Sequence, residues 1–304
     1  MSYDDDRPAT FNILVDGRPR EDDLTASPAL RTVIIPFAGV PAATGELLRR
    51  CQHLNFHNLH HNAAPTAEMA MGLLLSAAKR IVPADRALRR GDWRPRYTDD
   101  DTPLLEGKTA VILGYGAIGQ RLARFCLAMG LRVEAVRRRA TKTGRQGDVT
   151  VHPAAALDDA LRRAEVLLLA LPHTPETDGL LSGARLDLLP VGCVVVNVAR
   201  GAIIHERALF ERLRDGRLGA AGLDVWWRYP RVDSDDPEAG EAARRLTPPS
   251  RFPFGGLPNV VLSPHRAGHG AMTETLRAQH LADLLNAAAA GRELWNRIDP
   301  DAGY

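Results

Sequence analysis

The segment 107–130 constrains the fold of this 304-residue chain more than any other stretch. A short apolar run, Ala110–Leu113, leads into Gly114–Gly119 (GYGAIG), and apolar residues then recur at helical spacing. This order of buried strand, GxGxxG turn and helix is typical of a dinucleotide-binding βα unit. The first glycine permits the tight turn, the second lets the backbone approach a pyrophosphate, and the third allows close packing of helix on strand. The sequence therefore predicts a phosphate-binding helix N-terminus at this point.

The composition is that of a soluble globular protein. Charged residues make up 25% of the chain and the formal net charge is +2, so no overall field favours a nucleic-acid partner. The acidic N-terminus lacks the apolar segment of a secretory signal, and no apolar run is long enough to span a bilayer. Each of Cys51, Cys126 and Cys193 lies in an apolar run, which favours buried, reduced thiols. We therefore expect a cytoplasmic protein with no membrane or nucleic-acid partner.

The order of apolar runs predicts two α/β domains. Short strands are expected at 11–15, 32–36 and 54–59, and the polar, proline-containing segment 91–102 is the best candidate for a domain boundary. Beyond it, continuous apolar strands alternate with helices. This alternation indicates a doubly wound parallel sheet of the Rossmann type, covered by helices on both faces.

A long helix is predicted from about Pro65 to Arg90. Its first half, AEMAMGLLLSAA, is apolar on nearly all sides, and such a helix must be covered from several directions. We expect it to lie between domains, between subunits, or both.

Several predicted strands end in residues with useful chemistry, and ligands bind beyond the carboxyl ends of the strands in an open parallel sheet. Arg137–Arg139 follows the second strand, where an acidic residue would bind the ribose hydroxyls of NAD. Arginine suits a 2′-phosphate and so favours NADP over NAD, although the same run also fits an exposed basic turn. Arg200 and His265 each follow another apolar strand at this edge, and we expect both in the functional site.

A histidine cluster, His53, His57, His60 and His61, precedes the long helix. Alternate side chains diverge along a strand and no carboxylate or cysteine completes a ligand set, so we expect no metal. The cluster is then a set of surface imidazoles, a polar strand, or, for His60, His61 and Asn62, part of a cleft that helps hold an anionic substrate.

The chain resembles the D-isomer-specific 2-hydroxyacid dehydrogenases, the family that includes phosphoglycerate dehydrogenase. The resemblance rests on ordered motifs from about Asn62 to Gly270: NAAPTAE, LEGKTAVILGYGAIGQRLA, LPHTPET, VNVARGAIIHERAL, AAGLDV and LPNVVLSPHRAG. It implies a nucleotide-binding domain at 103–266 inserted into a smaller, abbreviated flavodoxin-like α/β substrate domain made of residues 1–102 and 267–304. It also implies a homodimer with the apolar helix after Pro65 at the interface. The implied activity is hydride transfer between NAD(P) and a small anionic 2-hydroxy or 2-keto acid.

The resemblance assigns roles to individual residues. Arg200 would bind the substrate carboxylate and carbonyl oxygen bidentately, and His265 would be the general acid in reduction and the base in oxidation. Asp224 and the backbone around Ala199 would hold the nicotinamide carboxamide, and the loop 38–40 would take the substrate carboxylate. The expected cofactor site consists of Gly114, Tyr115, Gly116, Ala117, Ile118, Gly119, Arg137, Arg138, Leu171, Pro172, Thr177, Val198, Ala199, Arg200, Asp224, His265 and Gly268. The expected substrate site consists of Ala38, Gly39, Val40, His61 and Asn62, and the expected catalytic residues are Arg200, His265 and Tyr229.

The chain departs from the family pattern at Tyr229, which stands where the family places a glutamate paired with the histidine. A neutral phenol can orient an imidazole but cannot stabilise an imidazolium as a carboxylate does. Another carboxylate, such as Glu241, could substitute. A second departure is that only about 37 residues precede the Ala38-Gly39 loop, room for fewer βα units than the family usually has.

Two other functions stay open at this point. One is dehydrogenation of another small oxyanion, as in the family's formate and phosphite branches. The other is a cofactor-sensing binding protein with weak or no catalysis, as in the family's transcriptional corepressors.

Overall fold

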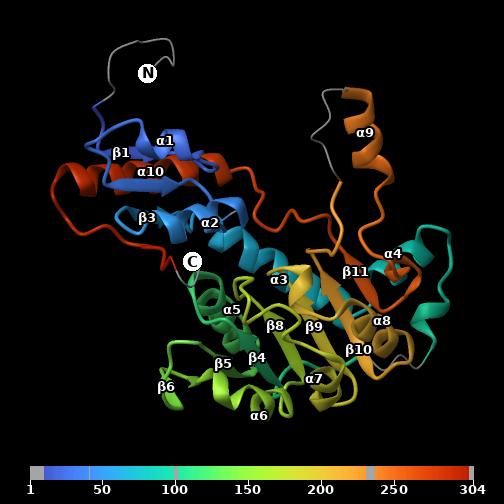
Figure 1. Ribbon diagram of the computed structural model, residues 1–304. Helices are drawn as coiled ribbons and strands as arrows, with labels where there is room; N and C mark the ends of the chain where they lie inside the picture. The colour runs from blue at the N-terminus through green and yellow to red at the C-terminus, as the bar shows by residue number, and fades with distance from the viewer. Residues whose placement is uncertain (1–9, 41, 99–101, 231–236, 301–304) are drawn as a thin grey trace. The chain divides into compact units, whose positions relative to one another are not determined.

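The computed structural model describes residues 10–40, 42–98, 102–230 and 237–300 (Figure 1). The chain divides into two compact units, a smaller unit formed by Met1–Ala63 with His269–Tyr304 and a larger unit formed by Ala64–Gly268. Residues 64–102 belong to the larger unit by their contacts, whereas the sequence-based division assigns them to the substrate domain. The division at 102/103 remains a prediction about which segments fold together.

The larger unit is built on an eight-stranded sheet in the order β11-β10-β9-β8-β4-β5-β7-β6. Neighbouring strands run parallel except β6, which pairs antiparallel with β7 at one edge. The strands are β4 (Thr109–Leu113), β5 (Arg132–Val136), β6 (Gly144–Gln146), β7 (Val149–His152), β8 (Val166–Leu169), β9 (Cys193–Asn197), β10 (Leu218–Leu223) and β11 (Val260–Leu262). The strand order reverses between β4 and β8, and ligands bind at such a switch point in doubly wound sheets.

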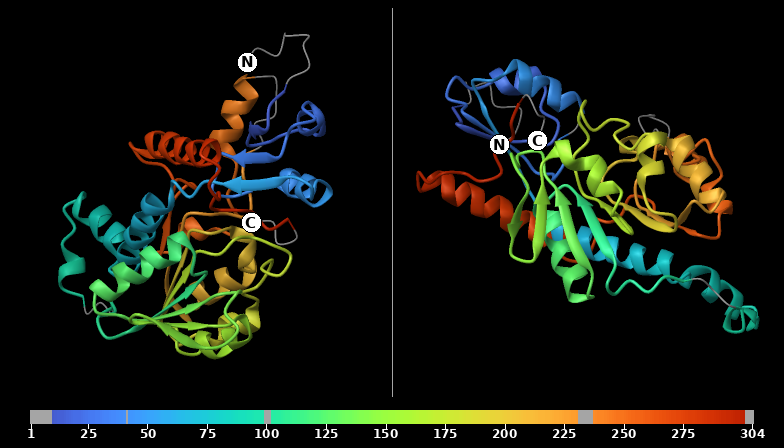
Figure 2. Two further views of the ribbon diagram at one scale, coloured as in Figure 1. Left: turned by 90° about the vertical axis from the view of Figure 1, so that its left-hand side faces the viewer. Right: turned by 90° about the horizontal axis from the view of Figure 1, so that it is seen from below.

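Helices cover both faces of this sheet, because successive residues of a strand point to opposite sides. Ala110 and Ile112 pack with α3 (Ala63–Ala78) and α5 (Ala117–Ala128) on one face. Val111 and Leu113 pack on the other face. The helices there are α6 (Leu157–Leu161), α7 (Gly183–Leu188) and α8 (Glu206–Arg214), and Figure 2 shows the strands between the two helical layers. The Rossmann-type doubly wound fold predicted from the sequence is confirmed.

The long helix predicted up to Arg90 is wrong in one respect, because the structure divides it into α3 and α4 (Ile81–Leu88). Arg80, between them, has a left-handed φ of 49°. Pro83 explains the break, since proline lacks an N–H and its ring would clash with the carbonyl of Lys79 in a continuous helix. Proline is tolerated in the first turn of the new helix.

The apolar surface of α3 is covered by the sheet of its own chain. Leu74 is fully buried in the core on that face. Leu73 packs closely on Gly222 of β10, because a Cβ added to Gly222 would lie only 2.7 Å from the Cβ of Leu73. The remaining elements of the larger unit are α9 (Pro237–Leu246) and short 3₁₀ turns at Arg94–Arg96, Ala154–Ala156, Gly201–Ile203 and Phe254–Gly256.

The smaller unit contains a three-stranded parallel sheet in the order β1-β2-β3. Its elements are β1 (Ile13–Val15), α1 (Glu21–Thr25), β2 (Thr32–Ile35), α2 (Ala42–Arg50), β3 (Asn55–Asn58) and α10 (Thr273–Ala289). Val33 packs toward Leu48 of α2, whereas Ile34 packs toward Leu284 of α10, which runs alongside the small sheet (Figure 1). The end of the chain returns to β3, where the N–H of Ile298 donates to the carbonyl of Phe56 at 2.8 Å. Three strands agree with the expectation of an abbreviated α/β domain.

None of the helices in the described part of the chain combines the length and the apolar character needed to cross a bilayer.

Candidate active site

The glycine turn between β4 and α5 has the shape that a dinucleotide requires. Gly114 has a φ of 94°, and a Cβ on it would lie 2.6 Å from the carbonyl oxygen of Ala170. A Cβ on Gly119 would lie 2.0 Å from the carbonyl oxygen of Gly114, so helix and turn touch backbone to backbone. Gly116 is the N-cap residue of α5, and no side-chain capping hydrogen bond is formed at this helix end. A Cβ added to Gly116 would meet no other atom within 4 Å. The turn therefore leaves room and free N–H groups at Gly116 for a pyrophosphate.

Other residues expected to bind the cofactor lie in this turn and after β5. Tyr115 is buried, whereas Ala117 and Ile118 are partly exposed in the first turn of α5. Arg137, Arg138 and Arg139 follow β5 with exposed side chains. The N–H of Arg137 donates to the carbonyl of His152 at 2.9 Å, which fixes the start of this basic run at the carboxyl edge of the sheet.

The loop after β8, Leu171–Thr177, is held together by its threonines. The hydroxyl of Thr177 donates to the carbonyl of Pro172 at 2.8 Å, and the N–H of Thr174 donates to the Thr177 hydroxyl at 2.7 Å. These bonds give the loop a fixed form at the same edge of the sheet as the glycine turn.

Arg200 follows β9 through a turn fixed by the side chain of Asn197. The Asn197 Oδ1 accepts from the N–H of Ala199, and its Nδ2 donates to the carbonyl of Arg200, each at 3.0 Å. The side chain of Arg200 is exposed, and its Nη1 donates to the carbonyl of Ala199 at 2.7 Å. Val198 and Ala199 are buried beneath this turn.

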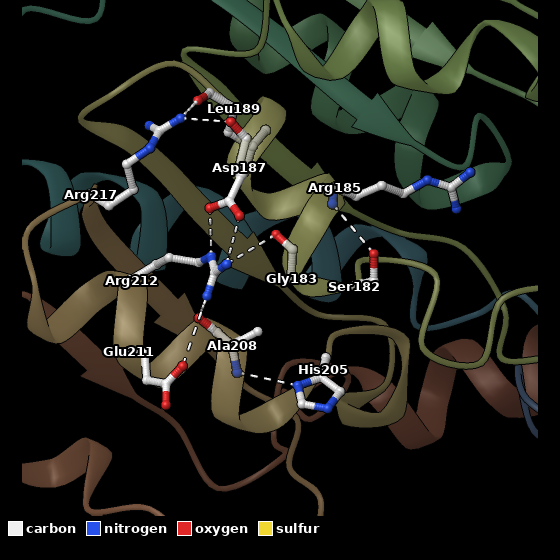
Figure 3. Close-up of polar contacts among 10 residues, drawn as sticks. All are labelled: Ser182, Gly183, Arg185, Asp187, Leu189, His205, Ala208, Glu211, Arg212 and Arg217. Atoms are coloured by element: carbon white, nitrogen blue, oxygen red, sulfur yellow. Dashed lines mark hydrogen bonds and ion pairs between the residues drawn. The ribbon is translucent and has the colours of Figure 1, made fainter.

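The segment after Arg200 is anchored by a network between α7 and α8 (Figure 3). Arg212 of α8 forms two hydrogen bonds with the carboxylate of Asp187 at 2.9 and 2.7 Å and a third with the carbonyl of Gly183 at 3.3 Å. Arg217 donates to the carbonyls of Asp187 and Leu189. His205 accepts from the N–H of Ala208 at 3.3 Å and so caps α8. The histidine of the IIHERAL sequence is therefore a helix cap.

Asp224, which follows β10, holds the loop that carries His265. Its carboxylate is 1% exposed and accepts three hydrogen bonds. The donors are the hydroxyl of Ser263 at 2.5 Å and the N–H groups of Arg266 and Ala267 at 2.9 Å each. His265 lies between these donors with a left-handed φ of 54°. A buried carboxylate with three donors is a strong clamp, because charge-assisted hydrogen bonds are about twice as strong as neutral ones.

Tyr229 brings Arg200 and His265 into one neighbourhood. The centroid of its ring lies 5.4 Å from that of the His265 imidazole, with 55° between the ring planes. Burial raises the pKa of the Tyr229 phenol, and the N–H of Trp226 and the positive charge of nearby Arg200 oppose this shift. The phenol oxygen accepts from the N–H of Trp226 at 3.1 Å. The contact between Tyr229 and the imidazole is therefore made by the aromatic ring of Tyr229.

The aromatic residues around Tyr229 are positioning residues that sequence reasoning missed. The indole of Trp226 donates to the carbonyl of Ser263 at 2.8 Å, and that of Trp227 donates to the carbonyl of Ile204 at 2.9 Å. Trp227 also stacks on Phe254 at 5.5 Å. Two adjacent tryptophans between a buried strand and a site residue were the available signal. Glu241, the alternative carboxylate, is ion-paired with Arg245 at 2.9 Å on α9.

The residues expected to bind substrate lie in the smaller unit. Ala38–Val40 follows β2, and the carbonyl of Ala38 accepts from Nδ2 of Asn58 at 2.8 Å. His61 is buried and Asn62 half-buried before α3. Within the described ranges, no three His, Cys, Asp or Glu side chains gather in a way that could hold a metal ion.

Comparison with known proteins identifies the family of this chain. The family model for the D-isomer specific 2-hydroxyacid dehydrogenase, NAD binding domain, matches residues 71–267. The chain belongs to the D-isomer specific 2-hydroxyacid dehydrogenase family. It is an NAD(P)-dependent oxidoreductase of the 2-hydroxyacid dehydrogenase type.

Individual members of this family resemble the chain over most of its length. Glycerate dehydrogenase of Methylorubrum extorquens is 28% identical over 90% of this chain and 80% of its own. D-3-phosphoglycerate dehydrogenase of Mycobacterium leprae is 32% identical over 92% of this chain but 49% of its own, so the chain spans about half the length of that relative. The solved structure of the NADPH-dependent glyoxylate/hydroxypyruvate reductase from Sinorhizobium meliloti, in complex with NADP and sulfate, superimposes with a TM-score of 0.76. It is 26% identical and covers 98% of this chain and 88% of its own.

Proposed function

We propose that this dehydrogenase transfers hydride between NADP(H) and a small 2-keto or 2-hydroxy acid. The observation that carries the proposal is the convergence on Tyr229, whose ring contacts the His265 imidazole and whose phenol lies in the field of Arg200. An arginine and a histidine that both lie near Tyr229 suit an acid with a carboxylate next to a carbonyl. The named activities of the glycerate and glyoxylate/hydroxypyruvate relatives support the same substrate class.

The roles of the two residues follow from their chemistry. Arg200 binds the carboxylate and the carbonyl oxygen of the substrate and draws electron density toward that oxygen. His265 donates a proton to this oxygen in reduction and removes it in oxidation. The nicotinamide, when bound, supplies or accepts the hydride. The reduction of one carbonyl thus consumes one hydride and one proton, and the proton comes from the imidazole.

Tyr229 takes the place of the family glutamate in this proposal. Its raised pKa keeps the phenol neutral, so it adds no negative charge beside the imidazole. Its ring limits the rotation of the imidazole, while the bond from Trp226 holds the phenol. Asp224 fixes the backbone on both sides of His265 in addition to the expected contact with the nicotinamide carboxamide.

The preference for NADP(H) rests on the exposed basic run after β5. Arg137 and Arg138 provide positive charge where an acidic residue would bind the ribose of NAD. Titration with NADPH and NADH tests this preference. We expect tighter binding of NADPH, and Arg137→Ser should weaken NADPH binding about 10-fold while it leaves NADH nearly unchanged. Tighter binding of NADH by the unaltered protein would contradict the preference.

We also infer a homodimer. The helix α4 and the segment after it carry several exposed apolar side chains, namely Ile81, Leu88, Trp93 and Tyr97. Such exposed apolar groups favour association with a second copy. Light scattering of the unaltered protein should give twice the chain mass, and Leu88→Glu should shift it toward the monomer.

A panel of 2-keto acids, followed by nicotinamide absorbance, tests the activity itself. We expect turnover of at least one small 2-keto acid, with Arg200→Ala lowering kcat/KM about 10³-fold and Arg200→Lys recovering little, since lysine lacks the planar fork. Turnover with formate or phosphite alone would move the assignment to another oxyanion. Cofactor binding without turnover, unaffected by Arg200→Ala, would indicate a cofactor-sensing binding protein.

A further inference from the structure

We propose that the smaller unit carries a binding site for a second anionic group of the substrate, built from Arg277 of α10 and His61. The inference rests on the proposed function, because it takes the ligand to be a 2-keto or 2-hydroxy acid. It narrows the substrate class to acids with a second negative charge, either a carboxylate or a phosphate, away from the reacting carbon.

Three contacts hold the guanidinium of Arg277 in one place. Its central carbon lies 5.7 Å from the centroid of the Phe37 ring, and its Nε donates to Nε2 of His61 at 3.4 Å. Its Nη1 donates to the carboxylate of Glu274 at 2.9 Å. No hydrogen bond or ion pair within the described ranges uses Nη2. The guanidinium is thus preorganised, with its Nη2 left to donate to an anion.

Phe37 brings this guanidinium next to the loop expected to receive the substrate carboxylate. The carbonyl of Phe37 accepts from the N–H of Leu59 at 3.2 Å, and the carbonyl of Ala38 accepts from Nδ2 of Asn58 at 2.8 Å. These bonds tie the carbonyl groups of the loop to β3 and its continuation. Among the described residues, no hydrogen bond uses the N–H groups of 38–40. The unused N–H groups follow Phe37 in the chain and Arg277 packs on the Phe37 ring, so Phe37 links the loop and the cation within the smaller unit.

Two imidazoles near Arg277 each have a buried nitrogen without a hydrogen-bond partner in the described part of the chain. Burial, followed by the positive charge of Arg277, lowers the pKa of His61, so the ring is neutral near neutral pH. Because an arginine can only donate, Nε2 of His61 accepts and Nδ1 carries the hydrogen. Nδ1 of His61 and Nδ1 of His280 are buried with no hydrogen-bond partner in the described part of the chain. A buried donor without an acceptor is unfavourable, and an anionic ligand would supply acceptor oxygens.

The balance of charged groups around His61 also favours the binding of an anion. The titratable groups that act on His61 are Arg277, His280, His60 and a single carboxylate, Glu274. The carboxylate of Glu274 is 77% exposed, and exposed ion pairs contribute little free energy. A ligand anion can therefore replace Glu274 at Arg277. In the proposed function Arg200 binds the first carboxylate of the substrate, which leaves Arg277 for a second negative charge.

Two pairs of acids that differ only in the second charge test the inference. Pyruvate is compared with oxaloacetate, and hydroxypyruvate with its 3-phosphate, by steady-state kinetics with NADPH at constant ionic strength. We expect the dianionic member of at least one pair to have the higher kcat/KM. The oxaloacetate arm identifies a carboxylate as the second group, and the phosphate arm identifies a phosphate.

Variants of α10 then assign the effect to the guanidinium. Arg277→Ala should lower the dianion to monoanion ratio of kcat/KM about 10-fold or more, mainly through KM of the dianion. Glu274→Gln should raise this ratio about 2-fold, because it removes the competing carboxylate. Arg292→Ala, an exposed arginine beyond α10, is the matched control and should leave the ratio unchanged.

The outcomes separate this inference from the proposed function. An Arg277→Ala variant with an unchanged ratio and the thermal midpoint of the unaltered protein would overturn the second-anion site. A preference for the monoanion in both pairs would overturn it as well. If the unaltered protein turns over none of the four acids, the proposed function falls and this inference falls with it. Turnover of pyruvate or hydroxypyruvate without a gain from the second charge removes only the inference.

Discussion

The two units of this dehydrogenase build their ligand-binding features in different ways. The larger unit relies on contiguous sequence, since Gly114–Gly119 alone forms the turn that fits a dinucleotide. The smaller unit combines residues that are far apart, such as His61 and Arg277, which are 216 positions apart in the chain. Backbone-built sites can therefore be recognised from a short motif, whereas sites built from side chains of distant segments require the fold.

The largest effect should come from the backbone contact in the larger unit. Gly119→Ala places a methyl group 2.0 Å from the carbonyl oxygen of Gly114, and neither backbone can move freely. We expect the free energy of unfolding to fall by about 3 kcal/mol, as measured by chemical denaturation. Gly116→Ala is the matched control. Its methyl meets no atom within 4 Å, so stability should hold while NADPH binding weakens. Equal losses of stability in both variants would break the comparison.

The clamp on the His265 loop should give the next largest effect. Asp224→Asn replaces one acceptor oxygen by an amide NH₂, which would face the N–H of Arg266 or Ala267. We expect kcat to fall about 30-fold, because the imidazole loses its position and a buried donor loses its acceptor. Ser263→Ala removes only one of the three donors and should cost less. A loss confined to NADPH affinity would show that Asp224 serves the cofactor alone.

A moderate effect is expected from Asn58 in the smaller unit. Asn58→Ala frees the carbonyl of Ala38, so the 38–40 loop loses its fixed orientation. KM for the 2-keto acid should rise about 5-fold with little change in kcat, as steady-state kinetics would show. His53→Ala, in the exposed turn before β3, is the control and should have no effect. A drop in kcat alone would argue that the loop acts on the chemical step.

The smallest effect concerns the pH dependence of stability in the larger unit. The guanidinium of Arg163, at 2.7 Å, holds the pKa of Glu134 below its ordinary value of 4.5, against the opposing effect of burial. His152 adds a bond at 2.8 Å. Because the folded pKa is the lower one, this stabilisation is complete above the ordinary value and is lost as pH falls through the folded value. Glu134→Gln should remove about 1 kcal/mol of unfolding free energy at pH 7 and less at pH 3. A difference that is the same at both pH values would contradict this sign.

The sequence predicted the features that depend on local geometry and periodicity. The doubly wound sheet followed from apolar runs such as Val166–Leu169 and Cys193–Asn197, which the structure buries completely. Arg200 and His265 were proposed as site residues because each follows an apolar run. These properties lie in the order of residues along the backbone.

Other features depend on contacts that no single stretch contains. Arg277 is held by Phe37 and His61, which are distant in the sequence. Asp224 accepts hydrogen bonds from donors around residue 265, which are 39 to 43 positions away. The break at Arg80 was missed because the apolar pattern continues across it while Pro83 forbids a continuous helix. Tertiary contacts decided the first two cases, whereas the break follows from the local effect of Pro83.

The left-handed backbone at His265 bears on how its side chain should be removed. Asparagine, aspartate and histidine enter this region several-fold more readily than other L-residues with a Cβ. His265→Ala would remove the imidazole and would also disfavour the left-handed backbone conformation. The measured loss of kcat would then combine both effects. Asparagine suits the native φ of 54°, so it isolates what the ring contributes. The backbone angle thus makes His265→Asn the preferred variant for removing the imidazole.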